Sequence, residues 1–172
     1  MLTIIPQCGI IPDNVDNNNQ QRFFGMKLST KGRYGTRALL ELALHHGEGP
    51  VLEKDIAQRQ DIPLQYLEHL MIPLIHGGIV RSARGAKGGI WLARPPKEIK
   101  LSQVIVLLEG SIAPVECVND PKYCPRSELC ATRDIWNELK EVMTGVLEST
   151  TLQDLVDRQK RKSEPEEVMY HI

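Results

Sequence analysis

Apolar side chains recur at helical spacing in the part of the chain that follows residue 33. Positions three and four apart lie on one face of a helix, so this stripe predicts a first helix over about residues 29–46. Gly47 and Gly49 supply the expected stop. The apolar members of the stripe are Tyr34, Ala38, Leu39, Leu42 and Ala43.

Two more helices, separated by a short break, are predicted over residues 53–59 and from Pro63 onward. Proline suits the first position of a helix because no helical hydrogen bond needs its missing N–H there. Pro73 falls inside the third helix, and we expect it to kink or end that helix. Helix, short turn and helix is the outline of a helix-turn-helix, here over about residues 53–76. Its expected internal contacts are Ile56, Ala57, Ile62, Leu67 and Leu70.

A β-hairpin is predicted next, because residues 79–83 and 90–93 read as two short strands, which follow Gly78 and Gly89. The connection between them is rich in glycine and carries two basic side chains, Arg84 and Lys87. It lacks the Gly-Lys-Ser/Thr ending and the following helix of a phosphate-binding loop. An ordinary surface hairpin is the remaining alternative. The position directly after a helix-turn-helix favours a DNA-binding wing over about residues 79–94.

The second half of the chain predicts a packing helix after Ser102 and a long amphipathic helix after residue 131. A stripe on the long helix is more often simple core than an interface. Here the winged domain is small, so we expect the stripe to pack on a second subunit. The packing helix carries Val104, Ile105, Leu107 and Leu108, and the stripe consists of Ile135, Leu139, Val142, Met143, Val146 and Leu147.

The charge of the chain is divided unevenly. The net charge is −1, but residues 26–94 contain ten Lys and Arg against six Asp and Glu, whereas residues 95–172 contain ten against fourteen. The first of these parts is therefore about +4, which favours a polyanionic partner such as double-stranded promoter DNA. A chain of 172 residues that is 41% hydrophobic suffices for one compact unit with an appended helical part.

The ends of the chain predict little structure. Residues 1–25 are polar and of low complexity, so we expect a disordered prefix, or a mis-assigned start with translation beginning at Met26. No stretch approaches a membrane span and no secretory signal is present, so we expect a cytoplasmic protein without a membrane partner.

Three cysteines, Cys117, Cys124 and Cys130, lie within fourteen residues of one another. The segment is rich in proline and charge, so a loop over residues 114–131 can turn all three thiols toward one point. Free thiols are usually buried among apolar neighbours, but this segment is polar. A disulfide is disfavoured because the number is odd and no secretory signal is present. Thiolates favour an iron–sulfur cluster, and they would also suit zinc with one further ligand.

These motifs, in this order, resemble the winged-helix transcription regulators typified by IscR, with their relatives NsrR and CymR. The resemblance covers about residues 26–155. It is carried by residues 26–34 (MKLSTKGRY), 55–60 (DIAQRQ), 66–68 (YLE), 80–89 (VRSARGAKGG) and the cysteine segment followed by residues 130–136 (CATRDIW).

The resemblance implies a homodimeric, mainly α-helical regulator, a repressor or an activator, with a small β wing. It divides the chain into a winged helix-turn-helix domain at residues 26–96, a packing helix, cluster loop and dimerisation helix at 97–155, and a flexible tail at 156–172. It implies that the cysteines hold a cluster, most simply 2Fe-2S. The residues implied to contact DNA are Gln65, Tyr66 and Glu68 on the third helix, Arg84 in the minor groove, and Lys27, Lys31, Arg33 and Lys87 on the backbone.

The chain departs from the pattern of IscR-like proteins at two places. The first gap between cysteines has six residues instead of five, and Arg133 stands where IscR-like proteins place a histidine ligand. Arginine stays protonated and does not bind iron. The fourth ligand therefore remains open among Asp134, Glu128, Glu116, a residue of the other subunit and an exogenous molecule.

We interpret the chain as a promoter-binding regulator that senses its cluster. A cluster-free regulator that responds to thiol oxidation, zinc or cysteine metabolism is the alternative within the same fold. An iron–sulfur electron-transfer or cluster-delivery protein is the alternative from another class, and it would not need the basic wing. We do not expect an enzyme, because the sequence contains no catalytic Ser/Cys–His–Asp set, no paired carboxylates and no nucleotide loop.

Overall fold

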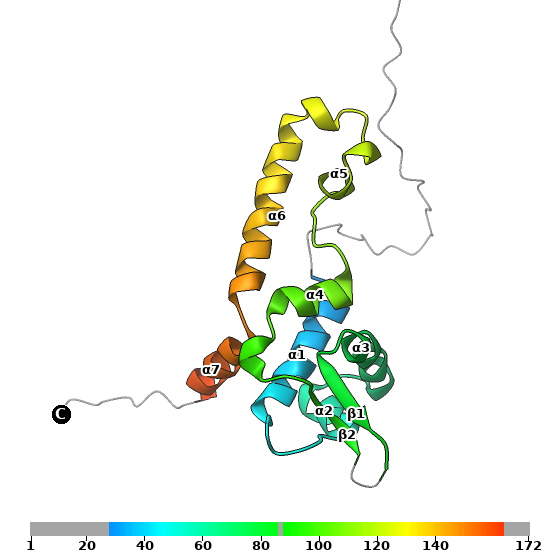
Figure 1. The fold of residues 1–172 in the computed structure, drawn as a ribbon, viewed down its shortest axis with the longest axis vertical. Helices are drawn as coiled ribbons and strands as arrows, with labels where there is room; N and C mark the ends of the chain where they lie inside the picture. Colours follow the sequence, from blue (N-terminus) through cyan, green and yellow to red (C-terminus); the bar gives the residue numbers. More distant parts are fainter. Residues whose placement is uncertain (1–27, 86–87, 164–172) are drawn as a thin grey trace, which may run out of the picture.

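The computed structural model describes residues 28–85 and 88–163 of the chain (Figure 1). The expected prefix, Lys27 and Lys87 lie outside these residues. None of the helices in the described part is long and apolar enough to cross a membrane. The elements are α1 (Thr30–Leu44), α2 (Glu53–Gln60), α3 (Leu64–His76), β1 (Val80–Ala83), β2 (Gly89–Leu92), η1 (Pro96–Glu98), α4 (Leu101–Glu109), α5 (Glu116–Asn119), η2 (Pro121–Tyr123), η3 (Ser127–Leu129), α6 (Ala131–Ser149) and α7 (Leu152–Ser163).

The three predicted N-terminal helices form a helix-turn-helix preceded by α1. Ser29 caps α1 by accepting a hydrogen bond from the Lys31 N–H to its side-chain oxygen. Between α2 and α3 the chain turns at Asp61, which adopts a left-handed conformation with φ of 49°. The Ile62 N–H then donates to the Ala57 carbonyl at 2.9 Å. All five side chains expected to hold this unit together are buried, namely Ile56, Ala57, Ile62, Leu67 and Leu70.

We expected Pro73 to kink or end the third helix, and it does not end it. The helix continues to His76, and the Gly77 N–H donates to the Pro73 carbonyl at 2.9 Å. Only one more turn follows the proline, and the residue four positions before it, His69, is exposed. Water can therefore satisfy the carbonyl that the proline leaves without a donor.

The predicted hairpin forms a two-stranded antiparallel sheet, with Val80 opposite Leu92 and Ala83 opposite Gly89. The chain before α2 adds a short bridge to it: Val51 and Ile90 exchange two backbone hydrogen bonds of 2.9 and 2.8 Å. The wing is therefore tied to the start of the helix-turn-helix as well as to its end.

One hydrophobic core joins the winged domain to the later helices. Ile99, Val104 and Leu108 from the region of α4, together with Leu152 and Val156 from α7, are buried in the same cluster as α1 and α3. The core thus crosses the boundary that we expected at residue 96. The structure also continues a helix to Ser163, within the range where we expected a flexible tail, because Leu152 and Val156 pack into this core.

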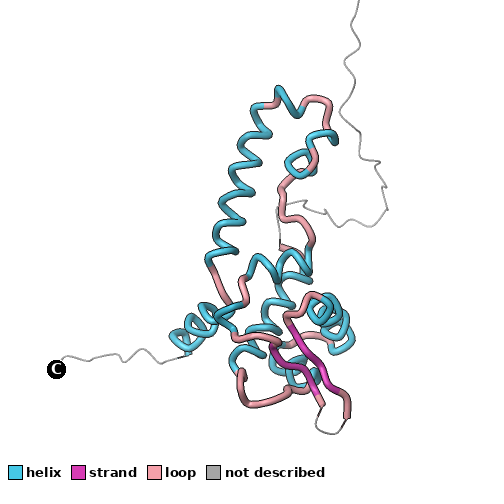
Figure 2. Tube along the Cα trace, in the orientation of Figure 1, coloured by secondary structure: helices cyan, strands magenta, loops and turns pink. Residues whose placement is uncertain are grey.

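The cysteine segment and α6 extend away from this core as a long arm (Figure 2). We expected an irregular loop between the packing helix and the dimer helix, but the segment contains α5, η2 and η3 as short helical turns. One of its tertiary contacts is the Ser127 hydroxyl, which donates to the Pro121 carbonyl at 2.7 Å. The chain returns along α6, which is 19 residues long and has no buried residue.

Candidate DNA interface and cysteine segment

The predicted base-reading residues lie on the exposed side of α3, next to the wing. Gln65 and Glu68 are exposed on α3, and Arg84 is exposed at the end of β1. Glu68 and Arg84 line one cleft between the helix and the wing. Glu53 lines it too, and its burial together with the charge of Glu68 raises the pKa of Glu53. The fold thus places a carboxylate and a guanidinium in the lining of one surface cleft.

Tyr66 belongs to a second group, formed with the first helix. Its ring meets the ring of Tyr34 edge to face, with centroids 6.0 Å apart. The guanidinium groups of Arg33 and Arg37 lie 5.9 and 5.6 Å from the Tyr34 centroid. Lys31 is exposed one turn earlier on α1. Positive charge therefore gathers beside the start of α3.

Arg37 was missed by reasoning from the sequence. Its Nε donates to the Gln60 side chain at 3.2 Å, and its terminal nitrogen also donates to the Gln60 carbonyl. It thereby fixes the turn of the helix-turn-helix to α1. The spacing of four from Arg33 was a usable signal, since it places both arginines on one helix face.

Glu41 was missed as well, although it is a charged residue inside the apolar stripe of α1. It is buried, and it accepts hydrogen bonds from Arg59 at 2.9 Å and from Gln60 at 2.8 Å. Burial by itself raises its pKa. The hydrogen bonds from Arg59 and Gln60, with the charges of Arg59 and His45, outweigh that effect, so the pKa of Glu41 lies below its ordinary value of 4.5.

The three cysteines are free and half-buried in the segment between α4 and α6. Cys130 is the N-cap of α6. A hydrogen bond with the Thr132 hydroxyl, at 3.1 Å, and then the backbone N–H of Arg133 lower the pKa of the Cys130 thiol. Within residues 28–85 and 88–163, no three His, Cys, Asp or Glu side chains stand close enough together to hold a metal ion. The fold thus brings the thiols onto one segment without bringing them to one point.

Arg133, which replaces a histidine ligand of IscR-like proteins, has a different contact here. Its Nε donates to the Cys117 carbonyl at 2.8 Å. The side chain therefore braces the first cysteine against the start of α6. The three nearby carboxylates that we considered as a fourth ligand, Glu116, Glu128 and Asp134, are all exposed.

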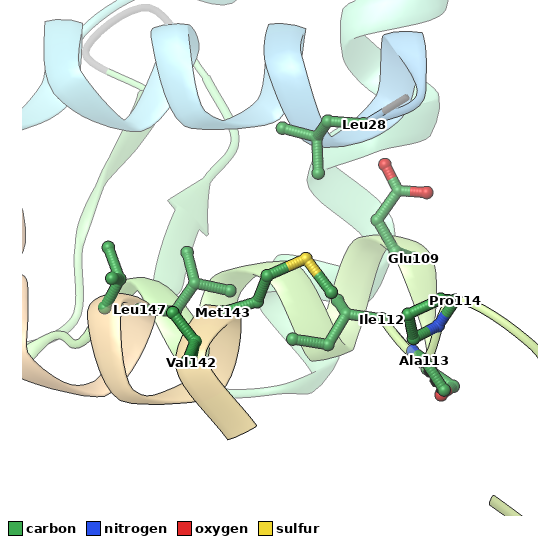
Figure 3. Close-up of a pocket in the computed structure, with 10 residues that line it drawn as sticks. Leu28, Glu109, Ile112, Ala113, Pro114, Val142, Met143 and Leu147 are labelled. Carbon is green, nitrogen blue, oxygen red and sulfur yellow. Dashed lines mark hydrogen bonds between the residues drawn. The ribbon is translucent and has the colours of Figure 1, made fainter. Parts of the chain in front are cut away.

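The predicted apolar stripe of α6 is largely open to solvent in the single chain. The exposed fractions of Ile135, Val142 and Val146 are 56%, 65% and 59%. A cavity of about 500 Å³ lies between the base of this helix, the end of α4 and Leu28, as Figure 3 shows. Val142 and Met143 form one wall, and Ile112 and Pro114 form another.

A family model described as "Rrf2: Iron-dependent Transcriptional regulator" matches residues 28–158. The chain belongs to the Rrf2 family. The match spans the helix-turn-helix, the wing, the cysteine segment, α6 and the first part of α7. It confirms the expected fold class, a mainly α-helical winged-helix protein with a small β wing.

Individual Rrf2-family relatives agree with this assignment. The chain is 47% identical over 131 residues to Protein rrf2 of Nitratidesulfovibrio vulgaris, covering 76% of this chain and 87% of the relative. It is 43% identical over 147 residues to the HTH-type transcriptional regulator CymR of Bacillus subtilis, covering 86% of this chain and 100% of the relative.

Two solved structures of Rrf2-type regulators superpose on the chain. The structure of CymR, the global cysteine regulator of B. subtilis, covers 77% of this chain and 97% of its own, with 43% identity and a TM-score of 0.65. The match to T. potens IscR covers 86% of this chain and 98% of the IscR chain, with 38% identity and a TM-score of 0.70. The family model and the CymR and IscR relatives are named as transcriptional regulators, and this Rrf2-family protein is a DNA-binding transcriptional regulator and not an enzyme.

Proposed function

We propose that this Rrf2-family regulator binds promoter DNA as a homodimer and that an iron–sulfur cluster, most simply 2Fe-2S, held by Cys117, Cys124 and Cys130 switches its binding. The observation that carries the proposal is the placement of three free, half-buried thiols on the one segment that connects α4 to α6. The donor set fits, because soft thiolates suit iron–sulfur clusters better than they suit hard cations.

The residues of the chain divide the work as follows. Gln65, Tyr66 and Glu68 would read bases and nearby phosphates from α3, and Arg84 would enter the minor groove from the wing. Contacts with the backbone, which give affinity and salt dependence, would come from Lys27, Lys31, Arg33 and Lys87.

The cysteine segment would act as the switch. A bound cluster supplies a group whose presence and redox state depend on conditions in the cell. Drawing Cys117, Cys124 and Cys130 together would order the segment, and so set the position of α6 relative to the winged domain. Two dimer geometries with different affinities for DNA are sufficient for regulation. Glu116, Glu128, Asp134 and a residue of the second subunit remain candidates for the fourth ligand.

Anaerobic purification of the chain with an absorption spectrum and iron and sulfide counts tests the cluster. Replacing Cys117, Cys124 or Cys130 singly by Ala should abolish the visible absorption, because two thiolates are too few to hold a cluster. Cys8, in the prefix, is the matched control, and Cys8→Ala should keep the full spectrum. A wild-type protein that stays colourless after anaerobic reconstitution would refute the proposal.

A cluster-free regulator that senses thiol oxidation, zinc or cysteine supply is the second candidate. The 43% identity to a protein titled the global cysteine regulator favours it. Zinc in place of iron after reconstitution, or operator affinity that changes with thiol oxidation of metal-free protein, would select this function.

A further inference from the structure

Glu109 stands at the junction between the cysteine segment and the winged domain. It is the last residue of α4. Gly110 follows with φ of 78°, a conformation that favours glycine, and Cys117 comes eight positions after Glu109. In Figure 3 the Glu109 side chain points toward the start of α1, where Leu28 lies.

Its carboxylate completes the first turn of α1. Glu109 Oε1 accepts hydrogen bonds from the Ser29 hydroxyl at 2.5 Å and from the Gly32 N–H at 2.8 Å. The first N–H groups of a helix have no acceptor within the helix, and negative charge at that end is favourable. Gly32 permits this approach, because a Cβ there would lie 2.5 Å from Glu109 Oε1. A residue of α4 thus organises the turn that carries Lys31 and Arg33.

Polar contacts on the other side of Gly110 hold the cysteine segment. The Ser111 hydroxyl accepts a hydrogen bond from the Asn119 side-chain nitrogen at 2.6 Å. The Asn119 side-chain oxygen accepts one from Lys140 of α6 at 3.2 Å. Asn119 lies two positions after Cys117 in α5. Hydrogen bonds through Asn119 therefore connect α5 and α6 to Ser111, which lies two residues after Glu109.

We infer that Glu109 is the positioning residue through which the conformation of the cysteine segment reaches the DNA-facing start of α1. A change in the segment that turns the end of α4 withdraws the carboxylate from Ser29 and Gly32. The first turn of α1 then loses two hydrogen bonds, and Lys31 and Arg33 lose their fixed position near phosphate. The link to DNA rests on the proposed function, whereas the link from the segment to α1 does not.

The link from the cysteine segment to α1 can be tested by itself. The test is the rate of amide exchange at Gly32 in the metal-free full-length protein, followed by NMR. The Gly32 N–H has Glu109 as its acceptor. We expect Glu109→Ala to raise its exchange rate about tenfold or more and Ser111→Ala to raise it severalfold. The double variant should exchange no faster than Glu109→Ala, because the effect of Ser111 passes through Glu109. Unchanged exchange in Ser111→Ala, or independent effects in the double variant, would overturn the inference.

Two further variants make the test specific. Glu98→Ala removes an exposed glutamate of η1 and should leave Gly32 unaffected. Gly32→Ala removes the same contact by changing α1 instead of α4, because the added Cβ would displace the Glu109 carboxylate. Alanine also raises helix propensity, so this variant tests the contact even if Glu109→Ala does not fold. In Gly32→Ala the amide at position 32 should exchange about as fast as in Glu109→Ala.

Operator affinity tests the link to DNA. The ratio of affinities between cluster-loaded and cluster-free protein should be large in wild type and fall to within about twofold in Glu109→Ala and Gly32→Ala, with the visible spectrum unchanged. A ratio equal to that of wild type in both variants would refute the coupling to DNA. If wild type shows no such ratio, the proposed cluster switch is wrong, and the exchange experiment still decides the role of Glu109.

Discussion

Glu41 shows how one buried charge orients the helix-turn-helix. The side chain sits in the apolar face of α1, and it accepts hydrogen bonds from Arg59 and Gln60 at the end of α2. Its position in the stripe was visible in the sequence. Its partners were not, because they lie on a second helix whose angle to α1 is set by packing.

Replacing Glu41 by Gln should lower the free energy of unfolding by about 1–2 kcal/mol. The substitution keeps the size of the side chain but removes the charge that Arg59 and Gln60 face. We keep the expected effect small because Arg59 is half exposed, which weakens the ion pair. Urea denaturation of both proteins at neutral pH measures the difference.

Glu48→Gln is the matched control, since Glu48 is exposed and pairs with His45; its effect should stay below about 0.5 kcal/mol. The pKa of Glu41 is lower in the folded protein than its ordinary value of 4.5. The Glu41 carboxylate therefore contributes to the free energy of unfolding above that pH, and this contribution is lost as the pH falls through the pKa of Glu41 in the folded protein. A difference between wild type and Glu41→Gln that persists undiminished well below pH 4.5 would contradict this account.

At the scale of elements, the sequence predicted those that depend on local patterns well. It did not predict the elements that depend on contacts between distant positions. The two strands fell within one residue of their observed ends, because short segments on either side of a glycine-rich connection are a local signal. The turns α5, η2 and η3 were not predicted. They are three or four residues long, and contacts such as that of Ser127 with Pro121 hold them. Such contacts join positions that no periodicity connects.

The wing as an element carries our prediction for DNA recognition. Arg84→Ala should weaken binding to the operator about tenfold and reduce the preference for the operator over unrelated DNA. The reason is that Arg84 lines the same cleft as Glu68, on the α3 face that we propose to read bases. A gel-shift titration with both DNAs measures affinity and preference together.

Arg161→Ala is a suitable control for Arg84, because it removes an exposed arginine from α7, which lies away from the wing (Figure 1). It should leave the preference for the operator unchanged. If Arg84→Ala also leaves specific binding intact, the assignment of residues 79–94 as a DNA-contacting wing is wrong.

At the scale of the whole molecule, the apolar face of α6 is only partly covered within the described chain, where Leu139, Met143 and Leu147 are half-buried. Val142 and Val146 are one helical turn apart on this face, and both are mostly exposed. The sequence predicted the stripe and its helix. It also led us to expect a domain that ends at residue 96, because it does not show that α7 returns to the core.

Val142→Glu combined with Val146→Glu should convert the proposed dimer into a monomer, because two charges cannot be buried at an apolar interface without partners. Sedimentation or size-exclusion chromatography with light scattering measures the change. Far-ultraviolet dichroism should stay near that of wild type, since both side chains lie outside the core.

Asn137→Asp adds a charge to the same helix at another exposed position and should leave the mass of the assembly unchanged. A doubly substituted protein that still has the mass of a dimer would show that α6 is not the interface.

The return of α7 has a mechanical consequence. The Leu101 N–H donates to the Thr150 carbonyl and the Leu152 N–H donates to the Ile99 carbonyl, both at 2.9 Å, so the chain leaves and re-enters the winged domain at adjacent points. The arm formed by the cysteine segment and α6 is therefore part of a closed loop with no free end. A shift within a closed loop is not absorbed by fraying, so we expect it to reach the elements that pack on its base, which include α1 and α3 against α4. A chain cut after α6 loses Leu152 and Val156 from the core, and its arm is then joined to the winged domain through α4 alone, so we expect a shift of the cysteine segment to reach that domain less strongly.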